Sequence, residues 1–353
     1  MLPAIMIENI IFVTLIVVVC GGVAPDLGKA GKMSLPKVLV TNNDIPEAGL
    51  DLLKGKFELI INNQSNPTRQ EIIDKIAGVD ALFWCTHQRL DEEILDAAGS
   101  QLKVVATMSA GLNHIDIDAL KRRNIPLAHT PTVLNKAVAN VAVLLALAAS
   151  RRLRESRIHI EEGLWSGFGV QYLLGTDIEN STVGIVGLGG IGQTIAKRLK
   201  AFEVARILYS GHRENPEGKQ LGAEFVPLDT LLRESDFVIV SAPLTDETKN
   251  MFNDTTFAKM KPTAVFVNIA RGPIVDQDAL IRALKNGTIF AAGLDVMVPE
   301  PLPTNNELLK LPNCVLMPHL GSATYKTRTA MAELTAKNII LGYENKPLLT
   351  PAY

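Results

Sequence analysis

From residue 37 onward, short runs of β-branched residues alternate with stretches whose apolar residues recur at helical spacing. This alternation is typical of repeated strand–helix units around a parallel sheet. It predicts an α/β protein with two Rossmann-like or flavodoxin-like βα domains, each with a parallel sheet, and a cleft between them. We expect strands at residues 38–41, 59–62, 81–84, 104–108 and 126–128, and again at 183–186, 207–209, 237–241, 264–269, 290–294 and 315–317.

Helical spacing is found at 46–54, 68–77, 91–98 and 115–123 between the strands of the first series. A longer segment, 135–162, is rich in Ala, Leu and Val and then in Arg, and it predicts one long helix. The stretch 323–343 is also helical in pattern, and we expect it to pack back onto the first domain. The predicted domains are therefore a substrate domain of 36–131 with 323–353, and a dinucleotide-binding domain of 132–322.

The N-terminal segment needs separate treatment because 10–20 is an almost unbroken apolar run followed by small residues. A targeting or anchoring segment would give such a run. However, the run is shorter than the ~20 residues that span a bilayer, and Glu8 precedes it where a secretory signal would be basic. We therefore expect residues 1–32 to be an extension outside the fold, either targeting or disordered.

Composition narrows the class of protein further. A length of 353 residues suits two domains, and 47% hydrophobic with 20% charged residues is typical of a globular protein. Lys and Arg (35) nearly balance Asp and Glu (37), so the chain has no large net positive charge that would attract nucleic acid or an anionic membrane. The cysteines Cys20, Cys85 and Cys314 show neither disulfide-framework nor zinc-ligand spacing. We expect a reduced, cytoplasmic environment and no metal site.

A glycine-rich segment follows the strand expected at 183–186 and precedes a helical run at 193–202. Its three glycines have GxGxxG spacing, and this position between strand and helix is the one that dinucleotide binding requires. The glycines permit a tight turn and close approach of a pyrophosphate to the helix N-terminus. The glycines with this spacing are Gly187, Gly189 and Gly192.

The end of the next strand distinguishes the two nicotinamide cofactors. An NAD-selective site carries an acid there to bind the ribose 2′-hydroxyl. This chain instead has Ser210, Gly211, His212 and Arg213, which could contact a 2′-phosphate, and the sequence therefore favours NADP. Glu214 follows at once and keeps NAD as an alternative.

Three further segments place polar residues just after predicted strands, where open α/β sheets bind ligands. They contain Arg271, Glu300 and His319. A guanidinium can bind a substrate carboxylate, and an imidazole can donate a proton near neutral pH. A carboxylate bonded to the imidazole favours its charged form. With a nicotinamide, these groups suffice to reduce a 2-keto acid.

The segments NIARG, GLDVMVPEPLP and MPHLGSAT, with the phosphate loop, resemble the D-isomer-specific 2-hydroxyacid dehydrogenases, and within them the glyoxylate/hydroxypyruvate reductases. The resemblance covers about 37–345. It implies that His319 is the proton donor, Glu300 its partner and Arg271 the substrate anchor. The product would be the D-2-hydroxy acid, or glycolate from glyoxylate.

The same resemblance implies further site residues. The loop 108–116 matches the carboxylate-binding loop of the family, in which the amides of Ala110 and Gly111 face the substrate. Further residues are implied by position. Gly189, Gly190 and Ile191 lie under the pyrophosphate, and 211–214, which begins with Gly211, lies at the ribose. Pro243 lies beside the cofactor, Ile269 and Asp295 lie near the nicotinamide, and Gly321 and Ser322 lie beside His319. Asn140 and Gly190 depart from the Glu and Arg that relatives usually carry, which makes the tightness of NADP binding less certain. Relatives also dimerise through the long-helix region, so we expect a homodimer.

Two alternatives remain at this point. The chain could be another dehydrogenase of the superfamily, acting on phosphoglycerate or formate. However, the sequence after His319 is too short for a regulatory domain, and relatives acting on formate have Gln in place of Glu300. It could also be a dinucleotide-sensing transcriptional corepressor on the same fold. Such a protein retains similar catalytic residues and differs by a peptide-binding groove and nuclear partners.

Overall fold

The computed structural model describes residues 34–353, so the expectations for the N-terminal extension lie outside the described residues. Within the described part, two parallel sheets account for all the named strands. The first contains β1 (Lys37–Val40), β2 (Glu58–Ile61), β3 (Ala81–Trp84), β4 (Val104–Thr107) and β5 (Leu127–Ala128). The second contains β6 (Thr182–Val186), β7 (Arg206–Ser210), β8 (Ala223–Phe225), β9 (Phe237–Val240), β10 (Val265–Asn268), β11 (Ala291–Leu294) and β12 (Cys314–Leu316). The predicted fold class is confirmed.

The two sheets differ in strand order. The five-stranded sheet has the order β2-β1-β3-β4-β5, as in flavodoxin-like folds. The seven-stranded sheet has the order β12-β11-β10-β9-β6-β7-β8, in which the direction of winding reverses between β6 and β9, as in the dinucleotide-binding fold. In such sheets the ligand crevice lies at this reversal, outside the carboxyl ends of the strands.

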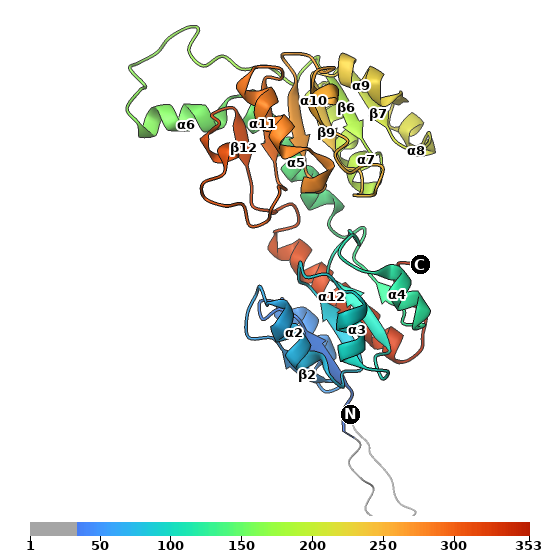
Figure 1. Ribbon diagram of the computed structural model, residues 1–353. Helices are drawn as coiled ribbons and strands as arrows, with labels where there is room; N and C mark the ends of the chain where they lie inside the picture. The colour runs from blue at the N-terminus through green and yellow to red at the C-terminus, as the bar shows by residue number, and fades with distance from the viewer. Residues whose placement is uncertain (1–33) are drawn as a thin grey trace, which may run out of the picture. The chain divides into compact units, whose positions relative to one another are not determined.

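Helices connect successive strands and cover both sheets (Figure 1). Side-chain caps begin several of them; Thr68 and Glu71, for example, form a reciprocal capping box at the start of α2. Around the first sheet lie α1 (Glu47–Leu53), α2 (Arg69–Ile76), α3 (Glu92–Ala98), α4 (Ile117–Arg122) and α12 (Tyr325–Tyr343). Around the second lie α5 (Asn135–Ser150), α6 (Leu153–Glu161), α7 (Gly190–Leu199), α8 (Pro216–Gln220), α9 (Leu228–Glu234), α10 (Asp254–Phe257) and α11 (Gln277–Lys285).

The C-terminal helix returns to the first sheet. α12 begins at a Thr324 cap, follows the last strand of the second sheet, and packs against α1, β3 and β4. Met331, Ala332, Ala336 and Ile339 are buried in this packing. The prediction that this segment packs back onto the first domain is confirmed.

One predicted helix is wrong in extent. The segment 135–162 forms two helices, α5 and α6, because Arg152 has a left-handed backbone with φ 54°. The carbonyl of Ser150 accepts a hydrogen bond from the Thr176 amide at 3.0 Å instead of continuing the helix. No residue of α6 is buried, and α6 with the loop that follows it projects from the second sheet (Figure 1).

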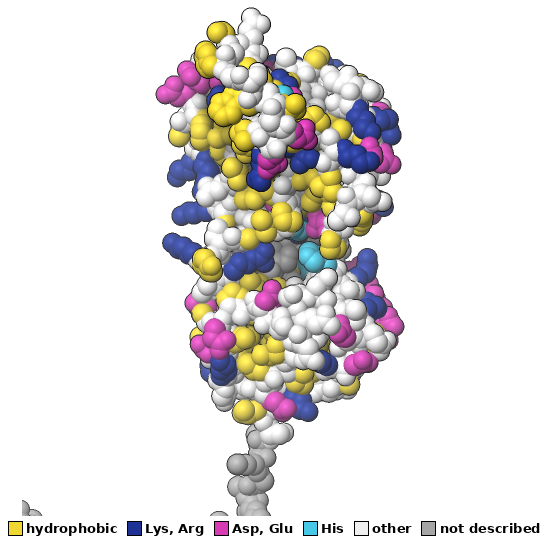
Figure 2. All heavy atoms as spheres, turned by 90° about the vertical axis from the view of Figure 1, so that its left-hand side faces the viewer, with side chains coloured by type: hydrophobic (Ala, Val, Ile, Leu, Met, Phe, Trp, Pro, Cys, Tyr) yellow, Lys and Arg dark blue, Asp and Glu magenta, His cyan; other side chains and the backbone are white. Residues whose placement is uncertain are grey.

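The predicted apolar face of the long helix is also not free. Ala139, Ala142, Leu145, Ala146 and Ala149 of α5 are buried in the core of this chain, where α5 packs on α7, β10 and β11. These residues are therefore covered within the chain, whereas Leu144 of the same helix is exposed. Further large apolar side chains are exposed in α6 and the loop after it, and hydrophobic side chains lie among polar ones over the face that Figure 2 shows.

No helix of residues 34–353 combines the length and the apolar character of a membrane span.

Candidate active site

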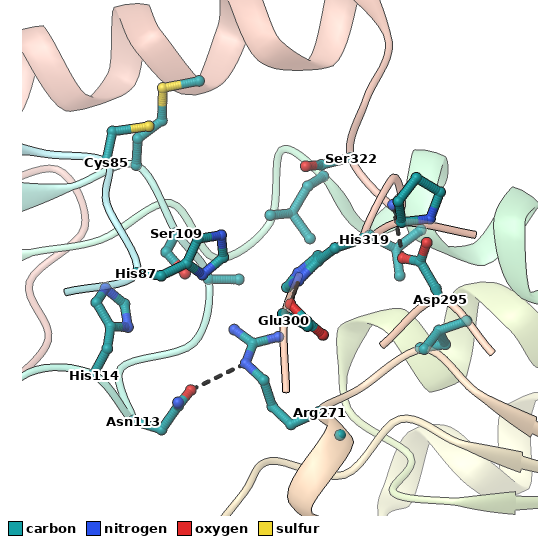
Figure 3. A pocket seen from close by; sticks show the side chains of 18 of the residues that line it. Cys85, His87, Ser109, Asn113, His114, Arg271, Asp295, Glu300, His319 and Ser322 are labelled. Carbon is teal, nitrogen blue, oxygen red and sulfur yellow. Dashed lines mark hydrogen bonds and ion pairs between the residues drawn. The ribbon is translucent and has the colours of Figure 1, made fainter. Parts of the chain in front are cut away.

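Residues from both sheets line a cavity of about 470 Å³. Loops that follow β3 and β4 form one wall, and loops that follow β10, β11 and β12 form another. Figure 3 shows the side chains of Arg271, Glu300 and His319 converging in this cavity. The three residues predicted to perform the chemistry therefore lie together, although they follow different strands.

His319 and Glu300 form a hydrogen-bonded pair. His319 Nδ1 lies 2.7 Å from Glu300 Oε2, and the Met297 amide donates to Glu300 Oε1 at 3.0 Å. Burial opposes ionisation of Glu300, but the His319 hydrogen bond and charge outweigh it and hold the Glu300 pKa below its ordinary value. An ionised Glu300 fixes Nδ1 as a donor, so His319 presents Nε2 to the cavity.

The turn that carries His319 is held by Asp295. The His319 amide donates to the Asp295 carbonyl at 2.8 Å, and the amides of Leu320 and Gly321 donate to its two carboxylate oxygens at 2.7 and 2.8 Å. These bonds fix His319 in a left-handed backbone conformation with φ 55°. Burial raises the pKa of Asp295. Asp295 thus positions His319, in addition to the cofactor contact that the resemblance implies.

Arg271 bridges the two walls of the cavity. Its Nε donates to Asn113 Oδ1 at 3.0 Å, and its Nη1 donates to the Ala270 carbonyl at 2.7 Å. Burial lowers the pKa of Arg271 below its ordinary value, but a guanidinium remains charged in proteins. Its Nη2 donates no hydrogen bond to any residue between 34 and 353. This nitrogen is free to bind a carboxylate.

The loop after β4 lies directly against that free nitrogen. A Cβ on Gly111 would collide with Nη2 of Arg271, so only glycine permits this approach. The amides of Ala110 and Gly111 donate no hydrogen bond within the part of the chain that the structure describes. Two unpaired amides beside a guanidinium form a suitable site for an anion.

The phosphate loop fits a dinucleotide. Gly187 has φ 94° and its Cα approaches the backbone of Ala242, so it makes the tight turn after β6. A Cβ on Gly192 would collide with the Gly187 carbonyl, which explains the glycine at the start of α7. Gly189, in contrast, faces open space. These are the three glycine roles that pyrophosphate binding requires, and Ile191 lines the adjoining cavity.

The residues predicted at the ribose lie at the carboxyl end of β7. Ser210 is half-buried at the end of the strand, while Gly211, His212 and Arg213 are exposed beyond it. Glu214 lies 3.5 Å from Lys219 in an ion pair. The segment thus presents a hydroxyl, an imidazole and a guanidinium, and the carboxylate of Glu214 forms an ion pair with Lys219.

The remaining predicted residues divide between the cavity and its surroundings. Ile269, Gly321 and Ser322 line the cavity, whereas Pro243 is exposed in the loop after β9. The two departures from the family lie outside the cavity. Asn140 of α5 accepts a hydrogen bond from Arg198 of α7 at 2.7 Å, and Gly190 lies against the Asn135 side chain.

The structure adds residues that the sequence did not identify. His87, His114 and Arg328 line the cavity with Cys85 and Met331. The ring centroids of His87 and His319 lie 5.7 Å apart. His114 belongs to the loop 108–116 that matches the family's carboxylate-binding loop, so its place in the cavity could have been predicted from the sequence. His87 follows β3 and Arg328 lies in α12, and no motif marks either of them.

No group of three His, Cys, Asp or Glu side chains in residues 34–353 could hold a metal ion.

Comparisons with known proteins agree with this geometry. Residues 143–321 match the family described as D-isomer specific 2-hydroxyacid dehydrogenase, NAD binding domain. The chain is 46% identical to human glyoxylate reductase/hydroxypyruvate reductase over 318 residues, covering 89% of this chain and 97% of the relative. It is also 46% identical to glyoxylate reductase of Thermococcus onnurineus over 311 residues, covering 86% and 92%.

A similar solved structure is an NADPH-dependent glyoxylate/hydroxypyruvate reductase of Sinorhizobium meliloti in complex with NADP and malonate. Its TM-score is 0.77 and its identity 32%, and the match covers 90% of this chain and 97% of that chain. The similarity extends over both sheets.

Proposed function

Because the chain belongs to the D-isomer-specific 2-hydroxyacid dehydrogenases and is an oxidoreductase of that family, we propose that it reduces glyoxylate and hydroxypyruvate with NADPH. The products are glycolate and the D-2-hydroxy acid. The observation that carries this proposal is the convergence of Arg271 with the His319–Glu300 pair in one cavity. The names of the human and Thermococcus relatives support the choice of substrates.

Arg271 and the loop after β4 bind the substrate carboxylate in this proposal. Two of the three guanidinium nitrogens are already bonded to Asn113 and Ala270, which orients the free Nη2 toward Gly111. One carboxylate oxygen accepts from Nη2, and the other accepts from the amides of Ala110 and Gly111. Ser322 lines the same cavity beside His319 and contacts the substrate from that side.

His319 supplies the proton. With Nδ1 donating to ionised Glu300, the protonated ring donates from Nε2 to the carbonyl oxygen of the substrate. A bound dihydronicotinamide supplies the hydride to the carbonyl carbon. The imidazole of His319 is then neutral, with its remaining proton on Nδ1. It takes up a proton from solvent before the next turnover.

A nicotinamide dinucleotide would bind along the carboxyl edge of the second sheet. Gly187 to Gly192 would hold its pyrophosphate, and Ile269, Asp295 and Gly321 would lie beside its nicotinamide. NADP is favoured over NAD because Ser210, His212 and Arg213 can bind a 2′-phosphate, and Glu214 is paired with Lys219. The complex of the Sinorhizobium reductase with NADP supports this preference.

We also infer the organisation of the chain. Residues 36–131 with 323–353 form the substrate domain and residues 132–322 the dinucleotide-binding domain, since α12 packs on the first sheet. The protein is a homodimer that buries the exposed apolar residues of α6 and its following loop. A cytoplasmic location is consistent with the free thiols of Cys85 and Cys314.

Steady-state assays with glyoxylate, hydroxypyruvate and pyruvate, each with NADPH and NADH, test the function. We expect His319→Ala and Arg271→Ala to lower kcat/KM at least ~100-fold while dinucleotide binding, measured by fluorescence titration, stays nearly intact. Arg233→Ala, which removes an exposed arginine far from the cavity, is the matched control. A wild-type enzyme that reduces none of the three acids, or variants with wild-type kcat/KM, would contradict the proposal.

A further inference from the structure

The cavity contains a second guanidinium that the proposed reduction does not use. Arg328 lies in the first turns of α12, is half-buried and lines the cavity that Arg271 also lines. No carboxylate of residues 34–353 forms an ion pair with it, and its side chain donates no hydrogen bond to that part of the chain. A partly buried cation without a protein partner is costly unless a ligand supplies the missing oxygen atoms.

The topology separates this guanidinium from the carboxylate site. Ala110, Gly111 and Asn113 follow β4, whereas Cys85 and His87 follow β3. Figure 3 shows Cys85 on the side of the cavity next to the helix, and Asn113 with Arg271 on the opposite side. Since Arg328 belongs to α12, it lies at the end of the cavity that Cys85 and His87 form.

The thiol and the imidazole at that end of the cavity do not supply a negative charge. Burial raises the pKa of the Cys85 thiol to about 11, so the thiol stays neutral, although the charge of Asp44 also reaches it. Burial lowers the pKa of His87 below its usual value, and the positive charges of His319, Arg271 and Arg328 lower it further. Neither Cys85 nor His87 therefore neutralises Arg328.

A bound 2-keto acid must reach this end. With its carboxylate on Arg271 and its carbonyl oxygen at His319, the substituent on the carbonyl carbon extends toward the loop after β3, where His87 lies 5.7 Å from His319 between ring centroids. We propose that Arg328 binds the oxygen atom on C3 of the substrate and thereby selects 3-hydroxy-2-keto acids over those with a methyl group there. This inference rests on the proposed function.

Hydroxypyruvate and pyruvate provide a sharp test because they differ only in that hydroxyl. In Arg328→Met, which keeps an unbranched apolar stem and removes the guanidinium with its donors, we expect the ratio of kcat/KM for hydroxypyruvate to that for pyruvate to fall at least about tenfold. Arg328→Lys, which keeps the charge, should give an intermediate ratio. Lys326→Met removes an exposed cation from the same turn and should leave the wild-type ratio.

The outcomes separate the two proposals. If the kcat/KM values of Arg328→Met fall in parallel for both acids, Arg328 is structural and the inference is wrong; an unchanged ratio also contradicts it. Should Arg328→Met fail to fold, as judged by its melting curve, the ratio in Arg328→Lys decides. If the wild-type enzyme reduces no keto acid, the proposed function itself has failed, and the inference falls with it.

Discussion

At the scale of single residues, the site depends on the close approach of the Arg271 guanidinium to the backbone of Gly111. The Nη2 atom of Arg271 lies where a Cβ of residue 111 would be, and the backbone of Gly111 is not in the left-handed region. Alanine can therefore adopt this backbone without strain. The glycine is required for the space that it leaves to the guanidinium and its ligand.

We therefore expect Gly111→Ala to damage binding and not folding. The added methyl group displaces Arg271 from the amides of the loop, so KM for glyoxylate should rise and kcat/KM should fall about tenfold or more. Steady-state kinetics and a thermal melt check this together. An unchanged KM would show that substrate does not bind between Arg271 and this loop.

A second residue-scale feature is the half-buried imidazole of His114. Burial, with the positive charge of Arg271, lowers its pKa from 6.5 to about 4. Its Nε2 lies 3.4 Å from the hydroxyl of Thr107. In the unfolded chain His114 therefore takes up a proton near pH 6.5, whereas in the folded chain it takes one up only near pH 4. Because the unfolded state binds more protons between these two pH values, the free energy of unfolding decreases as the pH falls from about 6.5 to about 4.

This difference predicts a pH-dependent free energy of unfolding. Between pH 7 and pH 5 the wild type should lose ~2 kcal/mol more than His114→Asn does, because the variant lacks the titrating group. Urea unfolding at the two pH values measures both losses. Equal losses in the two proteins would mean that His114 titrates normally in the folded state.

At the scale of elements, most strands and helices follow from apolar periodicity, but three features do not. β8 was missed because it has three residues at a sheet edge and only Ala223 of them is buried. The division of the predicted helix 135–162 was missed because an arginine, not a glycine or proline, adopts the left-handed conformation at 152. The helical run expected at 193–202 was placed three residues too late, because α7 begins at Gly190 within the glycine-rich loop and ends at Leu199.

The sequence pattern also predicts only part of the candidate site. Arg271, Glu300 and His319 were predictable because each follows a strand of one parallel sheet, and such strands end at the same edge. His87 and Arg328 were not, since their proximity depends on how α12 packs against the first sheet. The positioning role of Asp295 was also hidden, because it depends on the conformation of a turn that begins at His319.

At the scale of the whole molecule, the exposed apolar segment after α5 is not explained by the monomer. Phe168 is 97% exposed and Val170 81%, and Ile160 and Trp165 of the same region are each more than half exposed. A group of large apolar side chains that is not covered within its own chain is typical of an association surface. A second copy that offers the same segment would bury it symmetrically.

We expect Phe168→Glu to weaken the dimer, since a buried unpaired charge at the interface is costly. Light scattering after size exclusion should give about twice the 38.2 kDa chain mass for the wild type and a mass close to that of one chain for the variant. Leu349→Glu, at another exposed apolar position, is the control. A wild-type mass of 38.2 kDa would contradict the dimer.

The hydrogen bond between Arg271 and Asn113 joins residues 158 positions apart in the chain and belongs to the loops of both sheets. In the proposed function, the carboxylate site needs Arg271 from one half of the polypeptide and the amides of Ala110 and Gly111 from the other. Turnover therefore begins only after both halves have folded and docked, so that an incompletely folded chain is catalytically silent. An activity assay therefore detects only those molecules in which both halves are folded and in contact.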